Sequence, residues 1–551
     1  MIKKILKSRL FIPLLLLAAV GGFFGVNAYN YYRFPAITGI EPSVAYPGEL
    51  ISIYGSFFGN SRNGAEVRIA GGRPLSHSYQ NWSDNLIIVQ VPSDVGSGMV
   101  TVETRRGLSN GVLFTNREHI PIILSGPQKP GYPYLEAAEP ESGSVGAMVT
   151  ISGLNFSHER GNAAVFFTAA GVSDDNLIGD DALSGMIECS EIDYDYESWD
   201  EQQIQVFIPD GASSGNIRIQ TDRGISNALY FEVTGSAGTK TFFDKMGFQV
   251  EYGIDISGVD GDVSNGLDLW VPAVRFGLEQ RNVETVTEPV PLWNDYMGIM
   301  RYHLDNLNRD QTYSVSIKSW LERYNVETRI VIPKVKSWYN EDRRLYKVYT
   351  APEEQIPSDD QVIIDNAAAA VRRESNPYLK ASAIYKYLLK KMKYMNRVSS
   401  SSVVKSLEAG EGDSYTYSIL FTALCRASGI PARPATGVLV YNNKQATNHY
   451  WAEFYIDAFG WIPVDPALGD GARFGNFPID EDLDPVEYYF GNLDNHHINL
   501  TRGIVPVKQI APDGRISGRK GNYSLQTIYE ESIGIKSYSS YWRAVRIVDW
   551  W

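Results

Sequence analysis

The chain has 551 residues, of which 44% are hydrophobic and 12% aromatic, and its formal net charge at pH 7 is −14. This length predicts several domains, and the apolar content predicts folded segments rather than long disordered ones. Basic residues form no block beyond the extreme N-terminus, which argues against nucleic acid as a partner. The only cysteines, Cys189 and Cys425, exclude a disulfide framework, and no metal-ligand spacing is visible, so we expect no metal and no organic cofactor.

The first 34 residues have the pattern of an export signal. Four basic residues precede an apolar run from Leu10 to Val26, and tyrosines follow the run. This pattern predicts a signal anchor or a signal peptide, and the flanking tyrosines favour an uncleaved membrane helix. We therefore expect a bacterial envelope protein that is anchored in the inner membrane with its bulk in the periplasm, or secreted if the signal is cleaved.

One pattern of short alternating strands occurs twice, over residues 35–125 and 134–235. Trp82 precedes a strand and, further on, the run Gly107-Leu108-Ser109-Asn110, while Trp199 precedes the equivalent strand and Gly224-Ile225-Ser226-Asn227. Such strands separated by Gly, Pro and Asn predict two immunoglobulin-like β-sandwiches. The copies resemble IPT/TIG domains, a family of spacer or binding modules that brings no catalytic residues.

The two copies differ by an insertion, and a further β-rich segment follows them. The insertion, near residues 172–198, is rich in Asp and Glu, and we interpret it as a solvated hairpin excursion. Residues 240–350 continue the period-two alternation, which predicts a third β-rich domain, a candidate for another sandwich.

A helix with a polar start carries the first candidate site residue. The run Gly410-Glu411-Gly412-Asp413-Ser414 opens an apolar helix that stops at Gly429-Ile430-Pro431-Ala432-Arg433. Unpaired N–H groups at a helix N-terminus favour an anion, so a thiolate at position 414 would be stabilised there. A serine hydroxyl gains far less, because its pKa is too high for ionisation at neutral pH.

The next segment predicts a β-hairpin that pairs a histidine with a carboxylate. The runs His449-Tyr450-Trp451-Ala452-Glu453 and Trp461-Ile462-Pro463-Val464-Asp465-Pro466 lie on either side of Asp457. Because His449 and Asp465 are each eight residues from Asp457, a tip centred there would set the two side chains opposite each other on one face. The spacing alone therefore predicts a His-Asp pair.

Together these motifs resemble the transglutaminase-like superfamily of exported bacterial type. The resemblance implies an α+β papain-like core over residues 355–505. The C-terminal tail, residues 506–551, is rich in aromatic residues, and we expect it to dock on that core, because a free tail with so much apolar surface would aggregate. It places Ser414 in the position of the family's catalytic cysteine, His449 in that of the base, and Asp465 in that of the group that orients the imidazole. Cys425 cannot replace the nucleophile, because it lies about 16 Å further along the helix.

The expected architecture is therefore multidomain: an N-terminal membrane helix, two immunoglobulin-like β-sandwiches, a β-rich domain and a papain-like core. Three functions remain open. The first is a non-catalytic binding or scaffold protein for a peptide, protein or peptidoglycan-type ligand. The second is a serine-dependent acyltransferase or hydrolase that uses Ser414, His449 and Asp465. The third makes the IPT/TIG-like pair the working surface and the core a passive cap.

Overall fold

The computed structural model describes most of the chain beyond the N-terminus. The described residues are 20–22, 34–93, 95–117, 131–170, 182–396, 402–441, 444–472, 483–519 and 522–551, and the side chains of 293–296 are not described. The chain forms two compact units, Met1–Ser125 and Gly126–Trp551. The expected membrane helix, residues 1–34, lies almost wholly outside the described residues. Among the residues that are described, no helix has both the length and the apolar character needed to cross a bilayer.

The first repeat is a two-sheet β-sandwich, as the alternation predicts. One sheet has the order β1-β3-β6-β5 and the other β2-β9-β7-β4, with β8 paired to β7. Its elements are β1 (Ala36–Glu41), β2 (Val44–Ala45), β3 (Leu50–Ser56), β4 (Glu66–Ile69), η1 (Ser76–Ser78), β5 (Tyr79–Trp82), β6 (Leu86–Gln90), β7 (Gly98–Thr104), β8 (Gly107–Leu108) and β9 (Val112–Asn116). Ile51, Ile53 and Val100 point between the sheets and are fully buried.

The second repeat has the same construction. Its sheets have the orders β10-β12-β16-β15 and β11-β19-β17-β13-β14, with β18 paired to β17. Its elements are β10 (Tyr134–Glu139), β11 (Ser142–Gly143), β12 (Met148–Leu154), β13 (Ala164–Ala169), β14 (Met186–Glu188), β15 (Tyr196–Trp199), β16 (Gln203–Phe207), β17 (Ala212–Thr221), β18 (Gly224–Ile225) and β19 (Leu229–Val233). The indole of Trp82 donates to the carbonyl of Phe58 at 3.3 Å, and that of Trp199 donates to the carbonyl of Phe156 at 3.0 Å. Equivalent residues therefore make equivalent contacts in both copies.

The acidic insertion is not a solvated excursion over its described part, residues 182–198. Ile192 is 3% exposed and packs among Tyr349, Tyr455 and Trp461. The hydroxyl of Tyr349 donates to the carbonyl of Ile192 at 2.7 Å. The charge pattern suggested solvent exposure, but partners more than 150 residues away in sequence bury this segment. The first part of the insertion, residues 172–181, lies outside the described residues.

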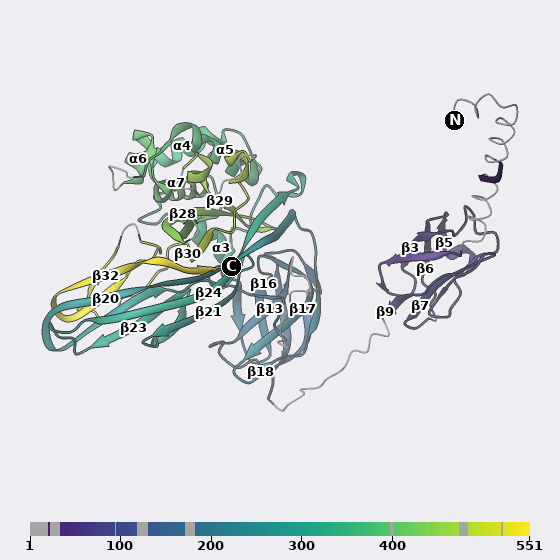
Figure 1. Cartoon of the computed structure of the whole chain (residues 1–551), viewed down its shortest axis with the longest axis horizontal. Helices are drawn as coiled ribbons and strands as arrows, with labels where there is room; N and C mark the ends of the chain where they lie inside the picture. The colour runs from purple at the N-terminus through teal and green to yellow at the C-terminus, as the bar shows by residue number, and fades with distance from the viewer. Residues whose placement is uncertain are drawn as a thin grey trace, which may run out of the picture. The chain divides into compact units, whose positions relative to one another are not determined.

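The β-rich domain is one continuous sheet rather than a third sandwich with two separate sheets. Its strands are β20 (Gly238–Pro272), β21 (Gln280–Glu288), β22 (Trp293–Tyr296), β23 (Ile299–Asp305), β24 (Tyr313–Ile330), β31 (Arg515–Ser517) and β32 (Glu530–Trp550). The 35-residue β20 pairs with β24 along its first half, with β23 at its end and with β32 over most of its length. Figure 1 shows these long strands running side by side away from the helices.

The C-terminal segment is a strand of this sheet, and it also packs against the core, where Val545 and Ile547 share a buried cluster with Val438. β32 pairs antiparallel with β20, from Phe248 opposite Trp550 to Leu269 opposite Glu530. Backbone hydrogen bonds between Gly247 and Trp551 extend the pairing to the last residue. The sequence indicated packing of the tail against the core, but not its pairing with β20.

The remaining elements form the core domain, residues 332–502. Its elements are η4 (Ile332–Lys334), α3 (Arg344–Thr350), α4 (Gln361–Val371), α5 (Pro377–Lys391), β25 (Lys393–Tyr394), α6 (Val403–Ala409), β26 (Glu411–Gly412), α7 (Ser414–Ala427), β27 (Ala432–Tyr441), β28 (Gln445–Ile456), β29 (Gly460–Val464), α8 (Pro466–Gly469), α9 (Pro485–Tyr488) and β30 (His497–Arg502). The sheet order is β29-β28-β27-β30, and all pairings are antiparallel. Figure 1 shows α4, α5, α6 and α7 gathered on one side of this sheet.

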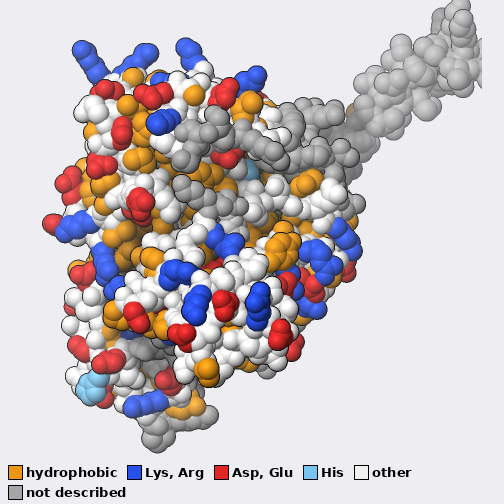
Figure 2. All heavy atoms as spheres, turned by 90° about the vertical axis from the view of Figure 1, so that its left-hand side faces the viewer, with side chains coloured by type: hydrophobic (Ala, Val, Ile, Leu, Met, Phe, Trp, Pro, Cys, Tyr) orange, Lys and Arg blue, Asp and Glu red, His pale blue; other side chains and the backbone are white. Residues whose placement is uncertain are grey.

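The two faces of the core sheet bury different clusters. Ala435, Leu439 and Trp451 pack with the helices, whereas Val438 and Val440 pack with residues of β20 and β24. Alternating residues of one strand thus serve two domains, which is why β27 is apolar almost throughout. Figure 2 shows acidic, basic and hydrophobic side chains intermixed over the face that it presents.

Candidate functional site

Helix α7 places Ser414 at its first position. Asp413 caps the helix, because its carboxylate accepts the N–H of Thr416 at 2.9 Å, and Ser414 is 7% exposed. The first turns of α7 pack on β28: the ring centroids of Tyr415 and Tyr450 are 5.3 Å apart, and the Ser418 hydroxyl donates to the carbonyl of Trp451. The helix therefore presents Ser414 beside the strand that carries His449, as the sequence predicts. A direct contact between Ser414 and His449 stays a prediction.

The structure brings His449 and Asp465 together in a fully buried pair. Nε2 of His449 lies 2.5 Å from Oδ2 of Asp465, and neither side chain is exposed. The hairpin register differs slightly from the expected one: Ala452 pairs with Val464 and Ile456 with Gly460, so the turn is centred on Ala458. Asp465 is the residue after Val464, which pairs with Ala452. In this register His449 is a diagonal neighbour of Asp465 rather than the residue directly opposite it, and the two side chains still lie on the same face of the hairpin.

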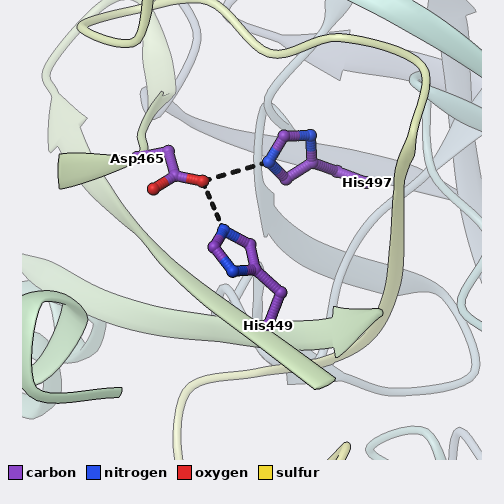
Figure 3. Close-up of side chains that lie close together, drawn as sticks. All are labelled: His449, Asp465 and His497. Carbon is purple, nitrogen blue, oxygen red and sulfur yellow. Dashed lines mark hydrogen bonds and ion pairs between the residues drawn. The ribbon is translucent and has the colours of Figure 1, made fainter. Parts of the chain in front are cut away.

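A second imidazole binds the same carboxylate oxygen, which the sequence did not indicate. Nε2 of His497 lies 3.1 Å from Oδ2 of Asp465, and Nδ1 of His497 lies 2.8 Å from Oδ1 of Asp494. Figure 3 shows both imidazole rings directed at one oxygen of Asp465. His497 is the first residue of β30, the outer strand next to β27, and is fully buried.

These contacts keep the buried groups charged. Burial opposes ionisation of Asp465, but the His449 and His497 imidazoles outweigh that effect and hold its pKa well below the usual range. Burial also lowers the pKa of His497, yet Asp494 and Asp465 raise it to about 9 overall. Burial raises the pKa of Asp494, whereas the neighbouring His497 brings it down to about 2. At neutral pH His497 is therefore an imidazolium between two carboxylates.

His449, Asp465 and His497 also form the one group with metal-ligand character among the described residues. Their ligand atoms all lie within 4.8 Å of one another. Two ligands bound to a zinc-like ion at about 2.0–2.1 Å normally stand roughly 3 Å or more apart. The 2.5 Å contact between His449 and Asp465 is instead that of a hydrogen bond, and the His497 nitrogens are both engaged by carboxylates. The geometry is that of a hydrogen-bond chain.

Two further motif residues join the core to the second repeat. Arg433 and Glu453 are opposite each other on β27 and β28, and Nε of Arg433 donates to Glu453 at 2.8 Å. The Arg433 guanidinium also forms an ion pair with Asp193 of the acidic insertion and lies 3.8 Å from the Trp461 ring centroid. Arg433 therefore forms an ion pair with a residue outside its own domain.

Comparisons with known proteins agree with this geometry. Residues 365–466 match the model of the Transglutaminase-like superfamily, and residues 35–116 match the model of the IPT/TIG domain. The transglutaminase-like match lies wholly within the core domain, residues 332–502. The second repeat has the sheet orders of the first, and thus the same fold as the matched IPT/TIG domain.

Individual relatives are distant. The chain is 30% identical over 173 residues to an uncharacterized protein of Haemophilus influenzae, a match covering 25% of this chain and 47% of that protein. The chain thus spans about half the length of the curated relative that it matches. A provisionally assigned cysteine protease from Cytophaga hutchinsonii is similar with a TM-score of 0.37 and 16% identity, covering 56% of this chain and 93% of that one. SGBP-B from a xyloglucan utilization locus in Bacteroides uniformis gives a TM-score of 0.14 and 13% identity, covering 53% and 99%.

A cavity of about 790 Å³ lies where the transglutaminase-like core meets the second repeat and the β-rich domain. Val274, Phe276 and Val290 give it an apolar wall, while Arg323 and Arg433 are among its charged residues. Trp451 lines this cavity and also contacts the site, with its ring centroid 6.3 Å from that of His449 and 5.3 Å from that of His497. The indole therefore lies between the cavity and the buried His-Asp chain.

Proposed function

We propose that the protein is a binding or scaffold protein whose transglutaminase-like site does not turn over substrate. The observation that carries the proposal is a serine, Ser414, at the start of α7, in a core that also contains an assembled His449–Asp465 pair. Papain-like sites depend on a thiolate that the helix N-terminus and an imidazolium stabilise. A hydroxyl at that position stays protonated, so the electrostatic advantage of the site is lost.

The ligand class we propose is a peptide, a protein or a peptidoglycan-type molecule. The cavity of about 790 Å³ supports this assignment, because its volume is that of a typical ligand pocket. Its apolar wall and the buried guanidinium of Arg323 suit a ligand with both hydrophobic and anionic parts. Arg323 is 1% exposed, donates to two backbone carbonyls and forms no ion pair within the described part of the chain.

The proposed location is the bacterial cell envelope. The basic residues and the apolar run before Asn27 support export, and an uncleaved run would anchor the protein in the inner membrane with its domains in the periplasm. Cleavage of the run would release the same domains as a secreted protein.

Reactivity at position 414 tests the absence of turnover. We expect wild type and Ser414→Ala to be equally inert toward a fluorophosphonate probe and toward a glutamine-peptide acyl donor with a labelled amine. Ser414→Cys should react at least about tenfold faster than wild type, because the site stabilises a thiolate but leaves a hydroxyl protonated.

A binding test accompanies the labelling. Immobilised wild type and Ser414→Ala should retain the same components of a muropeptide digest. Labelling of wild type at Ser414 would contradict the proposal, and so would a failure of both proteins to retain any component.

The second candidate is a serine-dependent acyltransferase or hydrolase. The 2.5 Å contact between His449 and an ionised Asp465 favours it, because this arrangement fixes the tautomer of a general base. In this reaction the Ser414 oxygen bonds to an amide or ester carbonyl carbon while His449 takes the hydroxyl proton. His449 then returns the proton to the leaving group, and the Ser414 backbone N–H stabilises the oxyanion. Fluorophosphonate labelling of wild type would favour this candidate.

A further inference from the structure

The carboxylate of Asp465 is held at both oxygens by three donors from three different elements. Oδ1 accepts the N–H of Leu468 at 2.9 Å, as the N-cap of α8. Oδ2 accepts from His449 on β28 at 2.5 Å and from His497 on β30 at 3.1 Å. Rotation of the carboxylate would break at least one of these bonds, so its orientation depends on His497 as well as on the hairpin.

We propose that His497 and Asp494 are positioning residues, which fix Asp465 and through it orient His449 toward position 414. The chain runs Asp494–His497–Asp465–His449, with contacts of 2.8, 3.1 and 2.5 Å. It rests on the proposed assignment of Ser414 to the nucleophile position, and it adds two residues to Ser414, His449 and Asp465.

His497 can hold Asp465 because its own ring cannot turn. A ring flip would move Nδ1 away from Asp494, and Asp494 is fixed in turn by the Tyr489 hydroxyl at 3.0 Å and by the backbone N–H of His496 at 3.0 Å. Both nitrogens of His497 face carboxylates, so both donate, and the ring carries a positive charge. The raised pKa of His497, caused by Asp494 and Asp465 against the effect of burial, agrees with this protonation state.

The same chain assigns the tautomer of His449. Asp465 is ionised and accepts only, so Nε2 of His449 carries the proton that it donates to Oδ2. In the neutral ring Nδ1 is then the basic nitrogen. Loss of the His497 donor would leave Oδ2 with a single partner and free the carboxylate to rotate, and the ring of His449 would lose its fixed orientation.

The test uses the full-length Ser414→Cys protein, because alkylation of the introduced thiol by iodoacetamide reports the local thiolate without any substrate. Cys189 and Cys425 are both buried, and peptide mapping assigns the label to each cysteine. We expect the apparent pKa of the thiol at position 414 to lie below that of a free cysteine, about 8.5. Adding His497→Gln should raise this pKa by about one unit or more, which lowers the alkylation rate roughly tenfold at a pH well below the thiol pKa.

The neighbouring His496 provides a matched control, since the hydrogen bonds that hold the Asp465 carboxylate within the described residues come from Leu468, His449 and His497. His496→Gln should leave the alkylation profile of the thiol at position 414 unchanged. Asp494→Asn should shift the profile in the same direction as His497→Gln while keeping the ring at position 497. Circular dichroism of each variant checks that it is folded.

The outcomes separate the two proposals. An ordinary thiol pKa in Ser414→Cys alone would overturn the assignment of position 414. A depressed pKa that His497→Gln and Asp494→Asn both leave unchanged would overturn only the positioning role. Imidazole NMR of wild type gives an independent check: the His497 ring should stay protonated up to about pH 8, and titration near its ordinary pKa of about 6.5 would overturn the inference.

Discussion

At the scale of single residues, the site is a chain of alternating acids and imidazoles that spans three elements of the core. His449 and Asp465 come from one hairpin, whereas His497 and Asp494 come from the far edge of the sheet. Each buried charge in the chain contacts an opposite charge or a hydrogen-bond donor, which offsets the cost of removing it from water. Asp494, His497, Asp465 and His449 therefore form a complete electrostatic framework within the domain that carries Ser414.

The charged His497 makes stability depend on pH in a defined direction. Its pKa is about 9 in the folded protein and near 6.5 when unperturbed, so its contribution is complete below pH 6.5, declines between 6.5 and 9, and is absent above 9. The charged or titratable side chains that face the ring are Asp465, Asp494, His449 and Tyr489, and Trp451 packs against it. Arg323 donates to the backbone carbonyl of His497 at 2.5 Å. About two and a half pKa units correspond to roughly 3 kcal/mol as an upper bound.

Thermal unfolding from about pH 6 to about pH 9.5 measures this dependence. Wild type should lose stability across the interval relative to His497→Gln, which has no charge to lose at that position. His496→Gln should follow wild type, because burial lowers the pKa of His496 below its ordinary value, so this ring has no charge to lose between about pH 6.5 and 9. Parallel curves for wild type and His497→Gln would show that the His497 ring is not charged.

At the scale of elements, β32 connects the end of the chain to the middle of the sheet. Glu530 at its start is 2% exposed and accepts five hydrogen bonds, two from Arg519 and one each from Tyr538, Ser540 and Trp542. Burial opposes ionisation, but these donors keep the Glu530 pKa below its ordinary value. β32 therefore begins at a buried carboxylate that accepts hydrogen bonds from side chains of the same β31–β32 hairpin.

Replacing this carboxylate should weaken the β-rich domain. Glu530→Gln removes the charge and turns one acceptor into a donor that faces other donors, so we expect a loss of about 2–3 kcal/mol. The midpoint of urea unfolding, followed by tryptophan fluorescence, measures the loss. Asp549→Asn, at a more exposed site on the same strand, should stay within about 0.5 kcal/mol of wild type. Equal midpoints for the two variants would contradict the structural role of Glu530.

The local elements were predictable from the sequence, but their partners were not. Period-two alternation, the cap at Asp413 and the glycine stop of α7 are signals within a few residues, and the spacing around Asp457 indicated the His449–Asp465 pair to within one residue of register. His497 lies 32 residues from Asp465, and nothing in the intervening chain fixes which strand edge β30 joins. The short separation of Asp494 and His497, three residues in the sequence, was a signal that the two side chains could form a pair.

At the scale of the whole molecule, the second repeat is part of the core assembly. Asp193 and Asp195 form ion pairs with Arg433 and Arg343, both of which are nearly unexposed. Gly146 of the same repeat has a φ of +81°, and a Cβ there would come within 2.4 Å of the Tyr455 hydroxyl. Acidic composition alone could not reveal this docking, because Arg433 is 240 residues away from Asp193.

Asp193→Asn should loosen this docking without unfolding either domain. Arg433 would keep its bond to Glu453 but lose its second carboxylate, and the indole N–H of Trp461 would keep only an amide oxygen as acceptor. Hydrogen exchange followed by mass spectrometry should show faster exchange over residues 186–196, by about tenfold, and no change in the first repeat. Glu197→Gln, an exposed acid-to-amide change on β15, should leave exchange as in wild type. Unchanged exchange in Asp193→Asn would show that the ion pair does not hold the domains together.

The division of the chain after Ser125 has a practical consequence for anyone who dissects the molecule. A cut between the second repeat and the core would expose Ile192 and leave Arg433 and Arg343 as buried cations without Asp193 and Asp195. A cut in the segment between the two repeats breaks none of these contacts. The shortest self-contained fragment therefore begins before Tyr134 and runs to Trp551, because the final strand completes the sheet beneath the site.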